Sequence, residues 1–431
     1  MTSPTSDASR AGIGRRRFLT GAAGVAAAAA GAVALPEPAL ATPPPRRSSN
    51  PPAGEGFVKV RHGNFELQHT PFRFGGTNTY YLHEQSHYMI DAALNDAAAM
   101  SLRVVRAWAF ADGSGQSYRP LQPEPYVYDD AAFDSLDYAV WKAGQLGIRL
   151  VLTLVNNWPD YGGMQQYVKW FLNLPDDSYG NDPVNHDHFY TSDAIKRCYK
   201  AYARYVTHRR NGYTGRRYNE DPTIMTFELA NEPRNRSDKS GSEVLAWVHE
   251  MSAWVKSLAP NQLVAVGDEG FYGDPSDSDY PYSNYEGNRW KDFLHVPTID
   301  YGTVHLYPGS WGETPANGKD PVAWGTTWIN DHLADGHRIG KPVVIEEYGL
   351  QVNADQGVPD EAARDAGYRA WTGAVEANGW GDQFWLLTSR VDDGSYYPDY
   401  DGFRVIWDND ATNPTNSAAQ LLNAHARRMR S

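Results

Sequence analysis

The stretch Thr223–Arg234 reads TIMTFELANEPR, an apolar run that ends in polar and charged side chains. Residues 223–227 have the length and composition of a short buried strand, so Glu232 falls at the carboxyl end of that strand. A second stretch, Lys341–Gly349, reads KPVVIEEYG and has the same form: a buried strand closed by two acidic residues and a glycine. In an α/β barrel, catalytic groups lie at this end of the strands.

Strand-like and helix-like stretches alternate along the rest of the chain, which favours a parallel sheet wrapped by helices. The expected strands are 72–80, 103–110, 148–155, 223–227, 263–267, 301–306, 342–346 and 382–387. The expected helices are 91–102, 129–147, 192–209, 243–258, 323–335, 360–377 and 416–428. Eight strands with helices between most of them, within 56–431, predict a single α/β domain with the (β/α)8 TIM barrel fold. A doubly wound open sheet is disfavoured because no Gly-rich phosphate loop follows the first expected strand.

The first 41 residues have the form of an export signal. Arg15-Arg16-Arg17 precede a run of Ala, Gly and Val from Thr20 to Leu35, and Ala39-Leu40-Ala41 offers a small-residue cleavage site. This pattern predicts a twin-arginine signal peptide over 1–41 and hence a secreted protein. A membrane anchor is the alternative, but the run of about 16 residues is shorter than the roughly 20 that span a bilayer. The proline-rich residues 42–55 are expected to be a linker.

Composition narrows the class of partner. The formal net charge of the 431-residue chain is −13 at pH 7, which argues against a nucleic-acid partner. Cys198 is the single cysteine, so no disulfide within the chain is possible, and its place on an apolar helical stripe predicts a core residue. Aromatic residues make up 13% of the chain, and such side chains stack on sugar rings but also fill cores.

Polar and aromatic residues follow most of the expected strands. In a barrel these side chains meet at one face, where they would surround a polar, uncharged ring such as a sugar. The two glutamates add the pair of carboxylates that glycoside hydrolysis requires, one to protonate the leaving oxygen and one to attack or to activate water. The residues at these strand ends are Arg106, Trp108, Asn157, Trp158, Asn231, Glu232, Glu269, His305, Tyr307, Glu347 and Trp385.

Several of these segments resemble a known family. The matching stretches are Val104–Phe110, Leu154–Trp158 with Gly162-Gly163 and Gln166-Tyr167, Asp187–Thr191, Phe227–Arg234, Asp268–Gly273, Val304–Pro308 and Glu346–Gly349. They look like the endo-β-1,4-mannanases of glycoside hydrolase family 5, which belong to a clan of retaining barrel hydrolases. The resemblance covers about residues 57–407. The Asn-Asn-Trp and Asp-Glu-Gly-Phe-Tyr stretches are closer to mannanases than to the related cellulases.

The resemblance assigns the two catalytic glutamates. It implies that Glu232 is the general acid/base and that Glu347 is the nucleophile of a double displacement. Glu346 is a rival for the second role, but neighbouring side chains on a strand face opposite sides, so only one of the two is expected to enter the site. Strand parity does not say which, and the resemblance favours Glu347. Glu228, inside the strand, is expected to be a buried partner for Arg103 or Arg106.

The resemblance also implies substrate-binding roles. Asn231 is expected to bond the 2-hydroxyl of the attacked sugar, and Trp385 to lie beneath that sugar. Arg106 and Tyr307 are expected to hold the nucleophile, because a nearby cation favours an ionised carboxylate. The remaining substrate-binding residues are expected to be Trp108, Asn157, Trp158, Arg234, Glu269 and His305.

The implied function is a secreted, monomeric endo-β-1,4-mannanase that acts on mannan, glucomannan or galactomannan without a cofactor or a metal ion. Within the clan, the alternatives are an exo-acting β-mannosidase and a β-1,4-glucanase (cellulase), and product size separates them. A sugar-binding protein on an inactive barrel is disfavoured by the intact pair of glutamates. A metal-dependent hydrolase is suggested by His186-Asp187-His188, but these residues are expected to pack within a loop, with no further ligand cluster.

Overall fold

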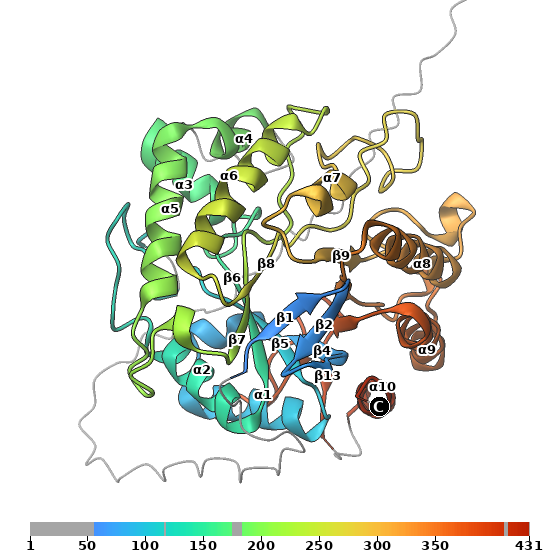
Figure 1. Cartoon of the computed structure of the whole chain (residues 1–431). Helices are drawn as coiled ribbons and strands as arrows, with labels where there is room; N and C mark the ends of the chain where they lie inside the picture. Colours follow the sequence, from blue (N-terminus) through green and yellow to red (C-terminus); the bar gives the residue numbers. More distant parts are fainter. Residues whose placement is uncertain (1–55, 116–117, 175–182, 409–412, 431) are drawn as a thin grey trace, which may run out of the picture.

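The computed structural model describes residues 56–115, 118–174, 183–408 and 413–430, so the expected signal peptide and linker lie outside the described residues. Eight parallel strands form one sheet in the order β8-β7-β6-β5-β4-β11-β10-β9, with helices packed around it (Figure 1). The strands are β4 (Phe74–Asn78), β5 (Val104–Trp108), β6 (Arg149–Thr153), β7 (Ile224–Glu228), β8 (Leu263–Ala265), β9 (Gly302–Leu306), β10 (Val343–Tyr348) and β11 (Gly381–Phe384). The predicted (β/α)8 TIM barrel is therefore confirmed.

Strands β8 and β9 lie at the two edges of this sheet, and a few bonds join them. The backbone N–H of Asp300 donates to Val264 O at 2.9 Å, and the Asp300 carboxylate accepts from Val264 N at 2.7 Å. Farther along, the N–H of His305 donates to Glu269 O at 3.1 Å. These contacts pair the edges that an open sheet would leave exposed.

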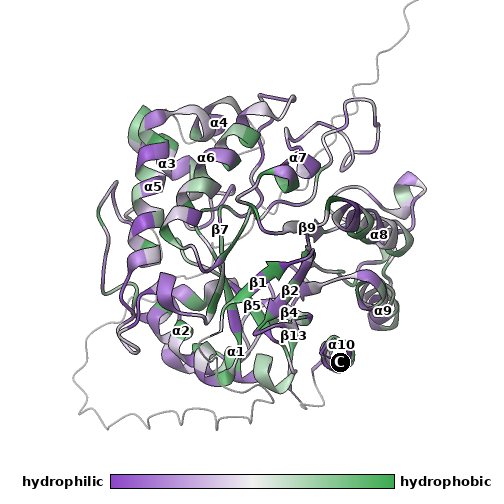
Figure 2. Ribbon diagram, in the orientation of Figure 1, coloured by the Kyte–Doolittle hydropathy of each residue, from purple (hydrophilic) through white to green (hydrophobic). Residues whose placement is uncertain are grey.

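The helices form the outer ring. They are α1 (His87–Ala99), α2 (Asp134–Leu146), α3 (Gly163–Leu172), α4 (Pro183–Thr191), α5 (Asp193–His208), α6 (Ser242–Leu258), α7 (Trp290–His295), α8 (Pro321–Ile339), α9 (Glu361–Asn378) and α10 (Asn416–Arg428). Figure 2 shows hydrophobic and hydrophilic stripes along α5 and α6. On α5 the buried stripe includes Ile195, Cys198, Tyr199 and Tyr202, as amphipathic packing against a sheet requires, and the core role predicted for Cys198 is confirmed.

Several predicted boundaries shift. The first helix begins at His87 rather than at residue 91, because the side chain of Ser86 caps it by accepting a bond from Met89 N. The second helix begins at Asp134 rather than at residue 129 and ends, as predicted, at Gly147, whose φ is 68°. The loop expected after β6 contains α3 and α4, so the segment His186–His188 lies on a helix and not in a loop.

A small antiparallel sheet precedes the barrel: β1 (Val58–Arg61), β2 (Asn64–Leu67) and β3 (Thr70–Pro71). In Figure 1 its strands are drawn in front of the barrel strands. The ring of Phe65 packs edge-on against Tyr301 at 5.3 Å and lies 6.0 Å from Phe74. Because these two partners stand at the starts of β9 and β4, the hairpin covers the amino-terminal end of the barrel. The opposite end is left for the site.

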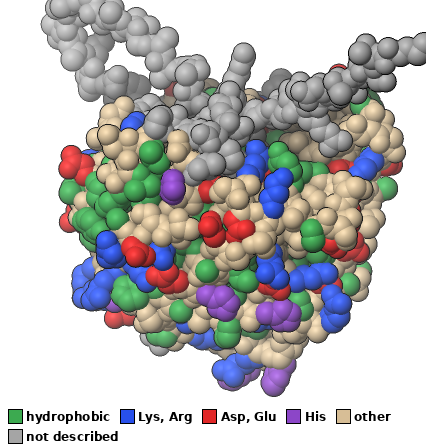
Figure 3. All heavy atoms as spheres, turned by 90° about the horizontal axis from the view of Figure 1, so that it is seen from above, with side chains coloured by type: hydrophobic (Ala, Val, Ile, Leu, Met, Phe, Trp, Pro, Cys, Tyr) green, Lys and Arg blue, Asp and Glu red, His purple; other side chains and the backbone are tan. Residues whose placement is uncertain are grey.

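The surface carries both signs of charge. On the face in Figure 3, Lys and Arg side chains lie interspersed with Asp and Glu. Among the helices that the structure describes, none combines the length and the apolar character required to cross a membrane.

Candidate active site

Glu232 lies four residues beyond the end of β7, in a loop that the neighbouring strand-end loops hold. Its backbone has a φ of 52°, a left-handed conformation that side chains other than glycine adopt at a cost. The N–H of Glu232 donates to Gly267 O at 2.8 Å. Gly267 has a φ of 86°, and a Cβ there would lie 2.0 Å from Ala230 O, so this close approach of the two loops requires glycine.

Glu347 lies on β10, where the strand departs from regular pairing. Ile345 pairs with Val304 and Glu347 with His305, so Glu346 is an extra residue on β10 opposite β9, as in a β-bulge. The expectation that Glu346 and Glu347 face opposite sides of the strand was therefore wrong. Both carboxylates are buried, and both approach Arg106 and His305. Because of the bulge, the side chains of Glu346 and Glu347 do not alternate between the two faces of the strand as they would in a regular strand.

The Glu347 carboxylate accepts two short hydrogen bonds. Arg106 Nη1 donates to Oε1 at 2.6 Å, and the Tyr307 hydroxyl donates to Oε2 at 2.6 Å. Charge-assisted bonds of this length are among the stronger ones in proteins. One permanent cation and one neutral donor thus fix the orientation of Glu347.

Arg106 is itself fully buried and holds more than Glu347. Its Nε and Nη2 donate to Glu228, with a shortest contact of 2.6 Å, and Nη2 also donates to Asn231 Oδ1 at 2.8 Å. Nη1 donates to Asn78 Oδ1 at 3.2 Å. The partner role expected for Glu228 is confirmed, with Arg106 as the arginine.

The Glu232 carboxylate has different partners. Trp158 Nε1 donates to Oε2 at 2.5 Å, and His305 Nδ1 lies 2.8 Å from Oε1. One oxygen of Glu232, one of Glu347 and a ring nitrogen of His305 all lie within 4.8 Å of one another. Burial opposes the charged form of His305, but Glu347, Glu232 and Glu346 outweigh it and raise the pKa of His305 to about 10.

Three more of the predicted residues extend this group on one side. Arg234 forms a two-point ion pair with Glu269, at 2.5 and 2.6 Å. Its backbone N–H donates to Asn157 Oδ1 at 3.2 Å, and its guanidinium lies 5.1 Å from the centre of the Trp158 ring. Burial raises the pKa of Glu269 to about 7, although Arg234 acts in the opposite direction.

Trp108 and Trp385 both lie beside Tyr80, and within the described part of the chain neither indole hydrogen-bonds to Glu232 or Glu347. Both pack on Tyr80: Trp385 is stacked on its ring at 5.5 Å, and Trp108 lies 4.9 Å from it. Trp385 Nε1 donates to Asp401 at 2.7 Å. Ten of the twelve predicted site residues are thus joined in the network around the glutamates, and Trp108 and Trp385 form a separate aromatic group around Tyr80.

Comparison with known proteins identifies the family. Residues 55–412 match the glycoside hydrolase family 5 β-mannosidase-like family. The chain belongs to this family. It is a glycoside hydrolase.

Individual relatives agree with this assignment. The chain is 39% identical over 303 residues to mannan endo-1,4-β-mannosidase 1 of Solanum lycopersicum, which covers 68% of this chain and 74% of the relative. It is 36% identical over 401 residues to mannan endo-1,4-β-mannosidase 1 of Oryza sativa subsp. japonica, with 88% and 87% covered. The structure of the hyperthermostable endo-1,4-β-D-mannanase of Thermotoga petrophila RKU-1 superposes with a TM-score of 0.72 at 42% identity, covering 83% of this chain and 99% of that one.

Two histidines bear on possible metal binding by this family 5 hydrolase. His186 is buried, with Nδ1 2.8 Å from the Asp187 carboxylate and Nε2 3.0 Å from Asn157 O. It therefore supports the loop that carries Asn157 and Trp158, the packing role that the sequence favoured. His305, with Glu232 and Glu347, has the spacing of a metal-binding group, but each of these side chains also bonds to a protein neighbour.

Three further residues that the sequence did not single out contact the site. Asn78 at the end of β4, Glu286 beside Arg234, and Asp401 under Trp385 all bond to predicted residues. Asn78 is the last residue of β4, so its position at a strand end could have marked it as a site residue. Glu286 and Asp401 lie in long irregular segments whose path no periodicity predicts.

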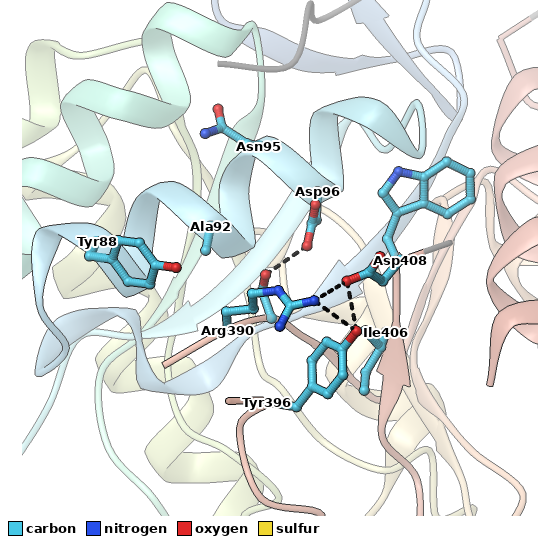
Figure 4. A pocket seen from close by; sticks show the side chains of 10 residues that line it. Tyr88, Ala92, Asn95, Asp96, Arg390, Tyr396, Ile406 and Asp408 are labelled. Atoms are coloured by element: carbon cyan, nitrogen blue, oxygen red, sulfur yellow. Dashed lines mark hydrogen bonds and ion pairs between the residues drawn. The ribbon is translucent and has the colours of Figure 1, made fainter. Parts of the chain in front are cut away.

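A cavity of about 130 Å³ lies elsewhere in this hydrolase, between α1 and the segment that follows β11 (Figure 4). Arg390, Tyr396 and Asp408 bond to one another there, and Asp96 accepts from the Ser389 hydroxyl at 2.7 Å. None of the predicted site residues lines this cavity.

Proposed function

We propose that the protein is an endo-β-1,4-mannanase that cleaves mannan, glucomannan or galactomannan with retention of anomeric configuration. The observation that carries this proposal is the 4.8 Å limit on the separation of Glu232 and Glu347 oxygens, at the carboxyl ends of β7 and β10. Retaining enzymes hold their carboxyl groups about 5–5.5 Å apart, whereas inverting enzymes need roughly 6.5–9.5 Å to admit a water molecule. The names of the relatives supply the mannan specificity.

In the first step, Glu347 attacks the anomeric carbon as the bond to the leaving oxygen breaks. Arg106 and Tyr307 orient the attacking carboxylate through their two hydrogen bonds. Glu232 donates its proton to the leaving oxygen, so the shortened chain departs as a neutral alcohol. A sugar bound covalently to Glu347 remains.

In the second step, the same Glu232 acts in reverse. As a carboxylate it removes a proton from water, and the resulting oxygen nucleophile attacks the anomeric carbon and releases Glu347. Trp158 and His305 offer hydrogen bonds to Glu232 when it is ionised. Two inversions give overall retention.

The remaining predicted residues would bind the sugar chain. Asn231, held by Arg106, would bond the 2-hydroxyl of the attacked sugar with the hydrogen-bonding capacity that it has left. Trp385 and Trp108 would present aromatic faces to the rings. The arm of Arg234, Glu269 and Asn157 would contact sugars farther along the chain.

The test is a product profile with stereochemistry. The purified protein should release short mannose oligomers from linear mannan and little from a soluble β-glucan, and proton NMR of the first products should show the β-anomer. A Glu347→Ala variant serves as the blank. Mannose as the sole product would indicate an exo-acting β-mannosidase, activity mainly on the glucan would indicate a cellulase, and the α-anomer would exclude retention.

We also propose that residues 1–41 direct twin-arginine export, that 42–55 form a linker, and that 56–431 form one secreted, monomeric domain. The arginine triplet before the Ala-rich run supports the export route. Replacing Arg15-Arg16-Arg17 with lysines should retain the precursor inside cells. Export of that variant at the normal rate would exclude the route, and sedimentation of the mature protein would test the monomer.

A further inference from the structure

The bulge on β10 leaves one buried carboxyl without a hydrogen bond. Glu346 is fully buried, and among the described residues neither of its oxygens has a hydrogen-bond partner. Its nearest cationic neighbours are His305 Nε2 and Arg106 Nε, each 3.7 Å from Oε2. That distance permits an ion pair but is too long for a good hydrogen bond. A buried carboxyl without hydrogen bonds lowers the stability of the folded state. A function for this carboxyl would explain its presence.

Of these two neighbours, His305 is the one with unused capacity. Arg106 Nε already donates to both oxygens of Glu228, at 3.0 and 3.1 Å. His305 Nε2, in contrast, has no hydrogen-bond partner among the described residues, although its Nδ1 faces Glu232. Two unsatisfied polar groups, Glu346 and His305 Nε2, therefore face each other inside the barrel.

We propose that Glu346 is a positioning residue that, from behind His305, keeps both ring nitrogens protonated and so fixes the Nδ1–H as a donor to Glu232. This inference rests on the proposed role of Glu232 as acid/base. Glu346 touches neither the sugar nor the reacting atoms in this scheme. It acts through His305.

The protonation of Nδ1 matters because Glu232 has one proton to give. When Nδ1 carries hydrogen, it donates to Oε1, and the acid proton of Glu232 remains on Oε2. When Nδ1 is bare, it accepts that proton in a hydrogen bond and holds it away from the leaving oxygen. A neutral His305 with its hydrogen on Nε2 would thus compete with the substrate for the same proton.

The charges around the pair favour this role. Four carboxyl groups face His305. Glu232 does so from the loop after β7 and Glu347 from β10. Asp268 and Glu269 do so from the segment after β8. Glu346 faces Arg106 on β5, Glu228 on β7 and the Tyr301 hydroxyl before β9.

The order of ionisation decides where Glu346 acts. Burial, reinforced by Glu228 and opposed by Arg106, raises the pKa of Glu346 to about 8, below the pKa of about 10 for His305. As pH rises, Glu346 therefore becomes an anion before His305 loses its proton. The new charge stabilises the imidazolium, so the effect of Glu346 belongs to the alkaline side of the pH profile.

The test compares the full-length wild type with Glu346→Gln. Nitrogen NMR of protein labelled with ¹⁵N-histidine, with the His305 signals assigned through His305→Gln, should show His305 losing its proton at a pH lower by at least about one unit in Glu346→Gln. The alkaline limb of kcat on linear mannan should move in the same direction. Below pH 6, kcat should stay within about threefold of the wild type, because Gln mimics the neutral carboxyl. Glu346→Asp, which restores a carboxylate, should recover part of the shift.

Asp112 provides a matched control. It is also a fully buried carboxyl, burial raises its pKa, and its oxygens lack hydrogen-bond partners among the described residues, but it faces neither glutamate. Asp112→Asn should leave the alkaline limb and the His305 titration in place.

Two results would overturn the inference. One is a His305 titration that does not move in Glu346→Gln. The other is an equal loss of kcat at every pH, which would indicate a packing role. Failure of the proposed function is recognised separately, by Glu232→Ala retaining its activity on mannan, and the NMR titration does not depend on that result.

Discussion

The two glutamates of this glycoside hydrolase lie close together, yet the protein holds them by different means. Glu347 is on a strand and accepts bonds from a permanent cation, Arg106, and from the Tyr307 hydroxyl. Glu232 is on a loop and faces the neutral indole N–H of Trp158 and an imidazole that can gain or lose a proton. Glu347 therefore faces a fixed positive charge, whereas Glu232 faces a side chain whose own charge can change. Pairs of carboxyl groups with contrasting environments are what acid/base and nucleophile assignments rest on.

The most drastic way to test this contrast is to delete each carboxylate. Glu347→Ala and Glu232→Ala should each lower kcat on mannan by several orders of magnitude, because each removes a group needed for the chemical step. They should differ on an aryl mannoside whose phenol needs no proton to leave. Glu232→Ala should recover its first step on that substrate, whereas Glu347→Ala should not. Stopped-flow release of the phenol measures the difference.

Azide separates the two variants further. In Glu232→Ala, azide should attack the covalent intermediate and give the β-glycosyl azide. In Glu347→Ala, it should attack the activated substrate directly and give the α-anomer. If the two variants gave the same azide anomer, the assigned roles would not stand.

A milder test removes one hydrogen bond from each carboxylate. Tyr307→Phe takes a donor from Glu347, and Trp158→Phe takes one from Glu232. Each loss should cost about 1.5–3 kcal/mol of transition-state stabilisation, or roughly 10- to 150-fold in kcat/KM. Steady-state kinetics on linear mannan measure kcat/KM for both variants, and a variant that keeps the wild-type kcat/KM would exclude a role for the hydrogen bond that it removes.

The difference between the strand that carries Glu347 and the loop that carries Glu232 also separates what the sequence could predict from what it could not. Apolar runs of strand length located the barrel strands, because a strand is a local feature. The residues that close these runs located Arg106, His305, Tyr307 and the pair Glu346-Glu347, and the family resemblance then favoured Glu347 within the pair. The bond from Trp158 to Glu232 joins two loops 74 residues apart, and no local pattern reports it. The resemblance had assigned Trp158 only to sugar binding.

Two further misses have a local cause. The expected alternation of Glu346 and Glu347 across the strand did not hold, because Glu346 is an extra residue on β10 between the pairs Ile345–Val304 and Glu347–His305. A single sequence contains no signal for such a bulge. The hairpin β1–β2 was also missed, although VKVR and NFEL alternate apolar and polar residues on either side of His62-Gly63, so the local signal was present in the sequence.

The smallest expected effect is on the free energy of unfolding, whose pH dependence tests the ionisation of Glu346 without any enzyme assay. Because burial raises the folded-state pKa of Glu346 from 4.5 to about 8, its carboxyl destabilises the folded state. That cost is absent below pH 4.5, grows between pH 4.5 and pH 8, and is complete above pH 8. Relative to the wild type, Glu346→Gln should therefore gain free energy of unfolding as pH rises from 5 to 8. Urea titrations at several pH values measure this difference, in which any fixed cost of burying the amide cancels. A difference that does not change with pH would mean that Glu346 is already ionised at pH 5, and the ordering of the Glu346 and His305 ionisations would then have to be abandoned.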